Sequence, residues 1–294
     1  MTRARFGVQF RNFPSEYGGQ VVDRVLEAAV QCEKAEFDSV WMIDHLEMRP
    51  PISYESQPIP DCWSMVSAIS SVTSKVKIGS LVSCVLFRNP HYLSRICTTI
   101  QDISSGRLIA GLGSGWFEDE FKNYGFPYPS ASERIRETRK AVEILHELAS
   151  IPVWIGGSGE KSTLKLVAKQ GDGCSLFGDP EATARKLRLL ENYCIAIGRD
   201  QKLITKSKHS NVVIGESQAE VNAKMRKIIP DETKWKLFAA SNIVGTPREC
   251  RDQVERYIES GVEYFTLSFP DLYEVNCLDI FSKSVIGEIV AIGR

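Results

Sequence analysis

The chain has 294 residues, of which 43 % are hydrophobic, and its formal net charge is −1. This length and hydrophobic fraction suffice for a sizeable core and are typical of a single α/β barrel domain over residues 1–294. The charge balance leaves no basic excess for nucleic acid or an anionic membrane, and no apolar run reaches membrane-spanning length. We therefore expect a cytoplasmic protein without nucleic-acid or membrane partners.

Short apolar segments alternate with helical patterns along the whole chain. Strands are predicted at 6–10, 38–43, 76–86, 108–110, 152–155, 173–176, 211–214 and 264–269. Helices are predicted at 21–35, 61–74, 90–104, 116–121, 132–148, 160–169, 180–197, 217–242 (with a break at Pro230), 246–261 and 275–292. Eight such strand–helix units predict a (β/α)8 TIM barrel.

A doubly wound open sheet is the alternative fold. It is disfavoured because the dinucleotide-binding fingerprint fails after Gly111, Gly113 and Gly115. The third spaced glycine of that fingerprint and the acidic residue on the next strand are missing.

Two glycine-rich turns follow the fourth and fifth predicted strands: Gly111-Leu112-Gly113-Ser114-Gly115 and Gly156-Gly157-Ser158-Gly159. Glycines allow a sharp turn and close approach of a large group, and amide N–H groups at a helix start bind anions. Neither turn has the lysine of a P-loop, so the phosphate tail of a cofactor is favoured over a nucleoside triphosphate. A tight turn without any ligand is the alternative for each.

Two further polar pairs, Asp44-His45 and Ser83-Cys84, end the second and third predicted strands. In a barrel these ends open at the same mouth as the glycine turns, where barrel enzymes keep their sites. His45 is a candidate to exchange a proton with a substrate, although a histidine that only caps a loop is the alternative. Asp44 is not expected to orient it, because successive residues of an extended chain face opposite sides.

The sequence gives little indication of a metal site or of a catalytic nucleophile. The eight cysteines form no CxxC pair and lie mostly in apolar runs, as reduced core thiols do. The four histidines show no HxH or HxxxH grouping with carboxylates, so no metal site is predicted. A GxSxG nucleophile elbow is also missing.

Several longer blocks match a known family. They are FDSVWMIDHL (37–46), KIGSLVSCVLFRNP (77–90), GRLIAGLGSGWFEDEFKNYGFPYPSASER (106–134), IPVWIGGSGEKSTLKLVAKQGDG (151–173) and VGTPRECRDQVERYIESGVEYFTL (244–267). On these blocks the chain resembles the luciferase-like monooxygenase superfamily, and more closely its branch of coenzyme F420-dependent oxidoreductases.

The resemblance implies a luciferase-like barrel with a flavin-type ring at the carboxyl-terminal mouth. A bulge on the third strand, often with a non-proline cis peptide, would lie behind the ring at Leu81 and Val82. The cofactor phosphate would be held by two sets of residues, Ser114, Gly115 and Trp116 after the fourth strand and Gly157, Ser158 and Gly159 after the fifth. His45 would donate or accept the substrate proton, and Asp44 would contact the ring or its neighbourhood.

The expected function is that of an F420-dependent oxidoreductase, which transfers a hydride between the deazaflavin and a small organic substrate. An FMN-dependent luciferase-like monooxygenase and a non-catalytic flavin-binding barrel are the alternatives. Family members carry an additional segment before the fifth strand, whereas here Leu148 is followed almost at once by Ile151. That deletion bears on the expected homodimer contact and on substrate specificity, which the loops 46–60 and 215–245 would set.

Overall fold

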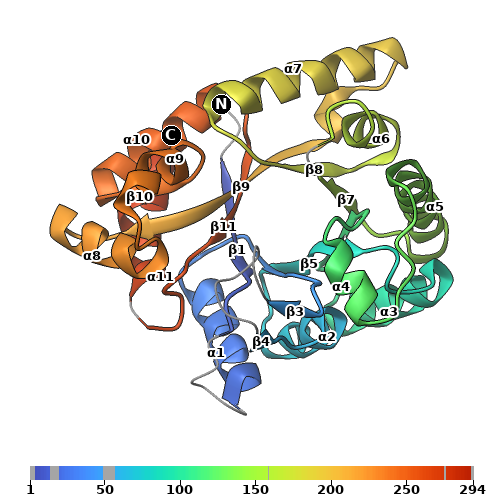
Figure 1. Ribbon diagram of the computed structural model, residues 1–294, viewed down its shortest axis with the longest axis horizontal. Helices are drawn as coiled ribbons and strands as arrows, with labels where there is room; N and C mark the ends of the chain where they lie inside the picture. Colours follow the sequence, from blue (N-terminus) through green and yellow to red (C-terminus); the bar gives the residue numbers. More distant parts are fainter. Residues whose placement is uncertain (1–3, 14–19, 49–56, 158, 275, 293–294) are drawn as a thin grey trace.

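The computed structural model describes residues 4–13, 20–48, 57–157, 159–274 and 276–292 (Figure 1). Eight parallel strands pair in chain order, and the pairing of β8 with β9 closes them into a barrel. The strands are β1 (Arg5–Phe10), β2 (Ser39–Met42), β5 (Lys77–Cys84), β6 (Leu108–Gly113), β7 (Val153–Gly156), β8 (Gly173–Leu176), β9 (Thr205–Ile214) and β11 (Tyr264–Ser268). The predicted (β/α)8 barrel is confirmed.

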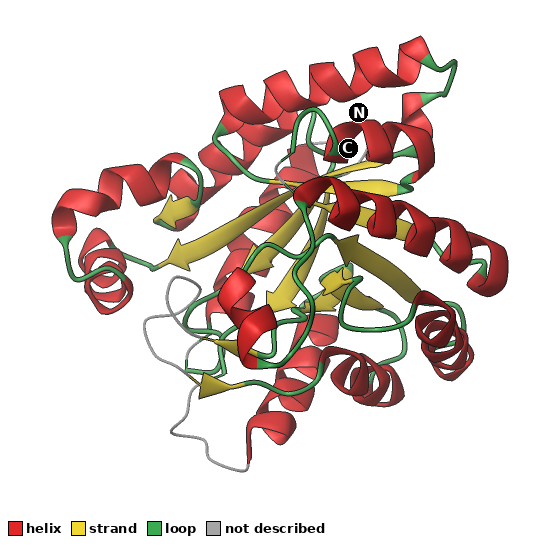
Figure 2. Cartoon of the chain, turned by 45° about the vertical axis from the view of Figure 1, so that its right-hand side comes forward, coloured by secondary structure: helices red, strands yellow, loops and turns green. Residues whose placement is uncertain are grey.

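Helices surround the strands (Figure 2). They are α1 (Val21–Lys34), α2 (Cys62–Val72), α3 (Pro90–Ile103), α4 (Glu118–Asn123), α5 (Ala131–Ala149), α6 (Thr163–Gln170), α7 (Pro180–Ala196), α8 (Gln218–Ile228), α9 (Trp235–Ala240), α10 (Pro247–Glu259), α11 (Cys277–Phe281) and α12 (Gly287–Ile292). Asp61 caps α2 by accepting a hydrogen bond from the Ser64 amide at 2.8 Å. None of these helices is long and apolar enough to cross a membrane.

Several predicted boundaries were wrong. Strand β6 continues to Gly113, three residues past its predicted end at 110, and β9 begins at Thr205 rather than at 211. Helix α6 begins at Thr163 rather than at 160, and a π-helical turn, η4 (Ser282–Ile286), interrupts the last predicted helix.

The structure also contains three short strands that were not predicted. β10 (Ile243–Gly245) pairs with the end of β9, and β3 (Glu47–Met48) pairs with β4 (Gln57–Pro58) in a two-stranded sheet. These strands have two or three residues each, which is too short for hydrophobic alternation to reveal.

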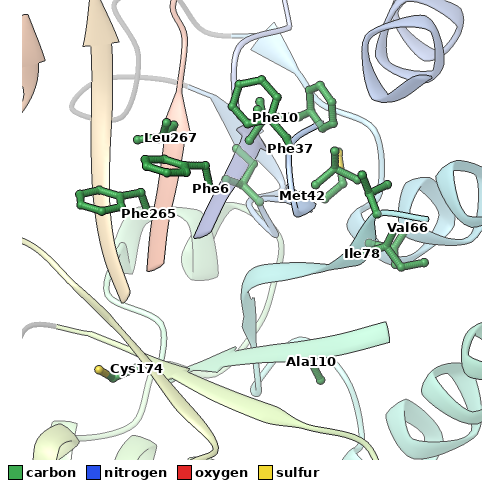
Figure 3. Packing of buried hydrophobic residues seen from close by; sticks show 14 of the residues in the cluster. Phe6, Phe10, Phe37, Met42, Val66, Ile78, Ala110, Cys174, Phe265 and Leu267 are labelled. Carbon is green, nitrogen blue, oxygen red and sulfur yellow. The ribbon is translucent and has the colours of Figure 1, made fainter. Parts of the chain in front are cut away.

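The core has two layers. Between the barrel and its helices lie side chains such as Phe6, Phe10 and Phe265, all fully buried (Figure 3). Inside the barrel, Trp41, Leu81, Ile109, Trp154 and Tyr264 form a separate cluster, with 4.8 Å between the ring centroids of the two tryptophans. Ile109, Trp154 and Tyr264 come from the first half of their strands, so the cluster fills the amino-terminal part of the barrel up to the bulge at Leu81. Space for a site therefore remains at the carboxyl-terminal mouth.

Candidate functional site

The loop that follows β2 presents His45 at the mouth of the barrel. Its Nδ1 donates to the Glu120 carboxylate, with 3.0 Å between Nδ1 and Oε2. Glu120 belongs to α4, is only 2 % exposed, and also accepts a hydrogen bond from the Leu46 amide at 2.6 Å. His45 is thus held by a buried carboxylate from the turn that follows the fourth barrel strand.

Asp44 faces away from His45, as the alternation of an extended chain predicts. Its carboxylate accepts hydrogen bonds from Ser83 Oγ at 2.6 Å and from an Arg88 guanidinium nitrogen at 2.7 Å. Burial raises the pKa of Asp44 and outweighs the opposing charge of Arg88. Arg88 also pairs with the half-exposed Asp61 at 2.6 Å, so it joins the ends of β2 and β5 to the start of α2.

Strand β5 carries the bulge that the resemblance implied. The pairing of β5 with β6 shifts register between Ser80 and Ser83, and the Leu81–Val82 peptide bond is cis. The side chain of Gln9 on β1 donates to the Leu81 carbonyl across the barrel, and Ser268 Oγ donates to Gln9 Oε1 at 3.1 Å. A buried amide from β1, two strands away, therefore supports the bulge from inside the barrel.

The glycines next to the bulge leave space for neighbouring protein atoms. A Cβ on Gly113 would lie 2.5 Å from a Val82 methyl group, and a Cβ on Gly156 would lie 2.6 Å from the other. A Cβ on Gly111 would overlap the Ser80 carbonyl oxygen. The glycine spacing therefore makes room for Val82, and the close approach of a ligand to these turns stays a prediction.

The turn after β6 does offer donors to an anion. Gly115 has a φ of +69°, and within the described part of the chain the amides of Ser114, Gly115 and Trp116 donate no hydrogen bond. The Trp116 ring stands edge-on to the His45 ring, with 6.2 Å between centroids. The turn and His45 therefore lie close together at the mouth of the barrel, as the convergence of strand ends predicted.

The helix after this turn contributes less to an anion site than expected. Helix α4 has only six residues, and its first turn contains Glu118, Asp119 and Glu120. These acidic side chains already balance the positive end of the helix dipole. An anion here would depend on the loop amides of residues 114–116.

The neighbouring turn after β7 lies beside the first, since Leu112 of β6 pairs with Ile155 of β7. Gly157 has a φ of +141°, which favours glycine, and Gly159 packs against the side chains of Ser162 and Thr163. Ser158 lies outside the described residues. Phosphate binding by either turn stays a prediction.

Three residues that hold the site together are not among the site residues predicted from the sequence. Glu120, Arg88 and Gln9 each reach a partner more than 40 residues away in the chain. Glu120 is part of a predicted helix, but nothing in the local sequence distinguishes it from Glu118 and Asp119. No group of three potential metal ligands occurs in the part of the chain that the structure describes.

These features define a class of protein: a parallel (β/α)8 barrel with a glycine-containing turn and a histidine–carboxylate pair at its carboxyl-terminal mouth. The family follows from comparison, because residues 5–150 and 146–242 match the model of the luciferase-like monooxygenase family. The chain belongs to this family.

Three known proteins illustrate the relationship. The F420-dependent glucose-6-phosphate dehydrogenase of Amycolatopsis mediterranei is 23 % identical over 92 % of this chain and 95 % of its own. The structure of an F420-dependent secondary alcohol dehydrogenase with an F420–acetone adduct superposes with a TM-score of 0.79, at 21 % identity over 98 % of this chain and 99 % of that one. The FMN complex of the oxygenating constituent of 3,6-diketocamphane monooxygenase from Pseudomonas putida superposes with a TM-score of 0.78. Its sequence is 14 % identical, and the match covers 98 % of this chain and 99 % of that one.

Proposed function

We propose that this chain is a coenzyme F420-dependent oxidoreductase that transfers a hydride between the deazaflavin and a small organic substrate. The observation that carries the proposal is the position of His45. A buried carboxylate holds it beside the turn after β6, where three amides donate to no group among the described residues. The names of the relatives, two of which include F420, support the choice of cofactor.

The residues present fit a flavin-type cofactor with a phosphate tail. The bulge at Leu81 and Val82 would lie against the ring, and the amides of Ser114, Gly115 and Trp116 would hold the phosphate together with Gly157, Ser158 and Gly159. Unpaired amide donors in a glycine turn are the chemistry that a phosphate requires. When bound, the deazaflavin supplies hydride transfer.

His45 handles the proton of the reaction. Its Nδ1 is engaged by Glu120, so Nε2 is the nitrogen left to face a substrate hydroxyl or carbonyl oxygen. In the direction of oxidation Nε2 accepts the hydroxyl proton, and in the direction of reduction it returns that proton to the carbonyl oxygen. Asp44, turned away and paired with Arg88, positions the chain on which His45 stands.

An FMN-dependent monooxygenase is the second candidate, because the FMN-bound neighbour shares the barrel and because the amides can donate to the phosphate of either cofactor. A titration of the purified protein with F420, FMN and FAD separates the two. Tryptophan fluorescence can follow it, since Trp116 lies at the turn and is 58 % exposed. Tight F420 binding without FMN binding supports the proposal, whereas tight FMN binding alone overturns it.

Turnover tests the role of His45. Oxidised F420 is offered with a panel of secondary alcohols, and reduced F420 with ketones and enones. We expect His45→Ala to lose activity by about a hundredfold or more while F420 affinity is kept. His91→Ala, a change on the surface helix α3, is the matched control and should behave as the parent protein. Binding without turnover in any panel would instead support a non-catalytic flavin-binding barrel.

A further inference from the structure

A second histidine, His209, lies inside the barrel on β9. The two residues beside it face the helices: Lys208 Nζ lies 4.6 Å from the Tyr257 ring centroid of α10 and donates to Ser210 Oγ. Side chains alternate along a strand, so His209 points into the barrel. It is 5 % exposed, and its ring centroid lies 5.4 Å from that of Phe177, which follows β8.

His209 stands opposite the bulge at the level of the mouth. Three strands separate β9 from β5 on either side of the barrel, so the two strands face each other. Leu176, the last residue of β8, pairs with Lys208, and His209 is therefore one residue beyond the end of that neighbouring strand. The histidine consequently lies on the wall of the mouth opposite Leu81 and Val82.

One nitrogen of this buried ring has no partner. Nδ1 lies 3.4 Å from Thr266 Oγ1, but Nε2 makes no hydrogen bond to any group that the structure describes. A buried polar atom left without a partner costs about 1–3 kcal/mol. Burial and the charge of Arg11 hold the pKa of His209 well below its usual range, so the ring is neutral. Thr266 Oγ1 lies at 3.4 Å from both Nδ1 and the Lys208 carbonyl oxygen, and it can donate to either one. In the tautomer that accepts from Thr266 at Nδ1, Nε2 carries the proton and can donate it to a ligand.

Arg11 supplies a positive charge at the same mouth. It follows Phe10, which packs in the outer layer, and is two residues from Gln9, whose side chain crosses the barrel interior. The Ile43 amide still donates to the Phe10 carbonyl, so the strand alternation extends to this point and turns Arg11 inward. Among the described residues no carboxylate pairs with Arg11, and burial lowers its pKa.

We infer that Arg11 and His209 form a subsite for an anionic group, a carboxylate or a phosphate, on the substrate. A guanidinium without a described counter-ion and a neutral imidazole donor are suited to receive such a group, which would satisfy both. The subsite lies away from the cofactor turns, which belong to β6 and β7. The inference rests on the proposed function, since it names the substrate class of that same pocket.

Binding rather than turnover tests the subsite. The protein loaded with oxidised F420, which does not reduce ketones, is titrated by calorimetry with cyclohexanone, with 4-oxocyclohexanecarboxylate and with inorganic phosphate. We expect the carboxylate to bind at least tenfold more tightly than cyclohexanone. Arg11→Gln and His209→Asn should each reduce that preference, by about ten- to a hundredfold for Arg11. A preference for phosphate over the carboxylate would identify a phosphorylated substrate.

The control is Arg5→Gln, a change of the same type on the same strand at the other end of the barrel, where Arg5 lies 4.9 Å over the Tyr264 ring. Equal binding of the ketone and its carboxylate, an unchanged preference in Arg11→Gln, or no saturable binding of either anion overturns the subsite. If F420 does not bind but the cofactor-free protein keeps an Arg11-dependent preference, the proposed cofactor fails and the subsite stands.

Discussion

Glu120 and His45 form one unit across two barrel segments that are 75 residues apart: the carboxylate of the first lies 3.0 Å from Nδ1 of the second. Because the same carboxylate binds the Leu46 amide, it holds both the ring and the backbone that carries it. A ring fixed through Nδ1 has one free nitrogen and one orientation, as proton exchange with a bound substrate requires.

Replacement of Glu120 therefore tests the unit. In Glu120→Gln the amide oxygen can still accept from Leu46, but the ring loses its anionic partner. We expect kcat to fall by about ten- to a hundredfold, with F420 affinity unchanged, since misplacement of a reacting group costs up to about 10²-fold. Glu118→Gln, on the exposed face of the same helix, is the control. An equal loss in both variants would mean that the charge of α4, and not the contact with His45, is responsible.

The fit of Val82 between two glycines makes a prediction for stability. Gly156→Ala would place a methyl group 2.6 Å from a Val82 methyl carbon, and we expect the free energy of unfolding to fall by about 1–3 kcal/mol. Val82→Ala removes the overlapping atoms, so the loss from Gly156→Ala should shrink in the Val82→Ala background. Urea unfolding of the four proteins in this cycle measures the coupling. Additive losses would contradict the packing role of Gly156.

Most of the barrel could be predicted from the sequence because parallel strands buried on both faces appear as apolar runs bounded by turn residues. The convergence of Asp44, His45, Ser83 and Ser114 followed from the topology of a barrel alone. The bulge at Leu81 and Val82 came from the family resemblance. Local patterning does not show which methyl group fills the space beside a glycine.

The residues that hold the site in place, such as Glu120 and Arg88, could not be predicted for a related reason. Glu120 is one of three acidic residues in a row, and only the folded chain turns it inward while Glu118 faces solvent. Arg88 follows an apolar strand like many surface arginines, yet it is 14 % exposed and joins two carboxylates. Such roles depend on contacts between distant segments, which periodicity does not encode.

Arg88 yields a third prediction. Arg88→Met would leave the buried Asp44 carboxylate without its counter-ion, which typically costs 3–5 kcal/mol. The pKa of Asp44, already raised above 3.8 by burial, would rise further. The native state would then hold a proton that the unfolded state releases, so the variant should lose stability as the pH rises from acidic to neutral. Unfolding at pH 5 and pH 7 measures this trend.

Asp61→Asn is the matched control, because it removes the other carboxylate that pairs with Arg88. Asparagine keeps the cap on α2 while it removes the half-exposed charge next to Arg88. We expect a change of less than about 1 kcal/mol, as for other exposed ion pairs. A loss as large as that of Arg88→Met would show that Asp61, and not Asp44, is the partner that matters.

Lys208, on the outer side of β9, makes the stability of the protein depend on pH at neutral and alkaline pH. Its ammonium is fully buried and donates to the carbonyls of His209 and Ser241 at 2.6 and 2.7 Å. Burial lowers the pKa of Lys208 from 10.5 to about 7. Above pH 7 the native state has released a proton that the unfolded state keeps up to pH 10.5. Stability should therefore rise with pH, by up to about 1.4 kcal/mol per unit.

The measurement belongs between pH 7 and 8.5. At higher pH the buried cysteines act in the opposite direction, because burial raises the pKa of thiols such as Cys174 to about 12, above the value of 9.0 that applies in the unfolded chain. Lys208→Met should abolish the rise of the unfolding free energy over this window, whatever its effect at a single pH. Lys206→Met, on the same strand two residues earlier, should keep the slope of the parent protein. A slope that survives in Lys208→Met would show that another group releases the proton.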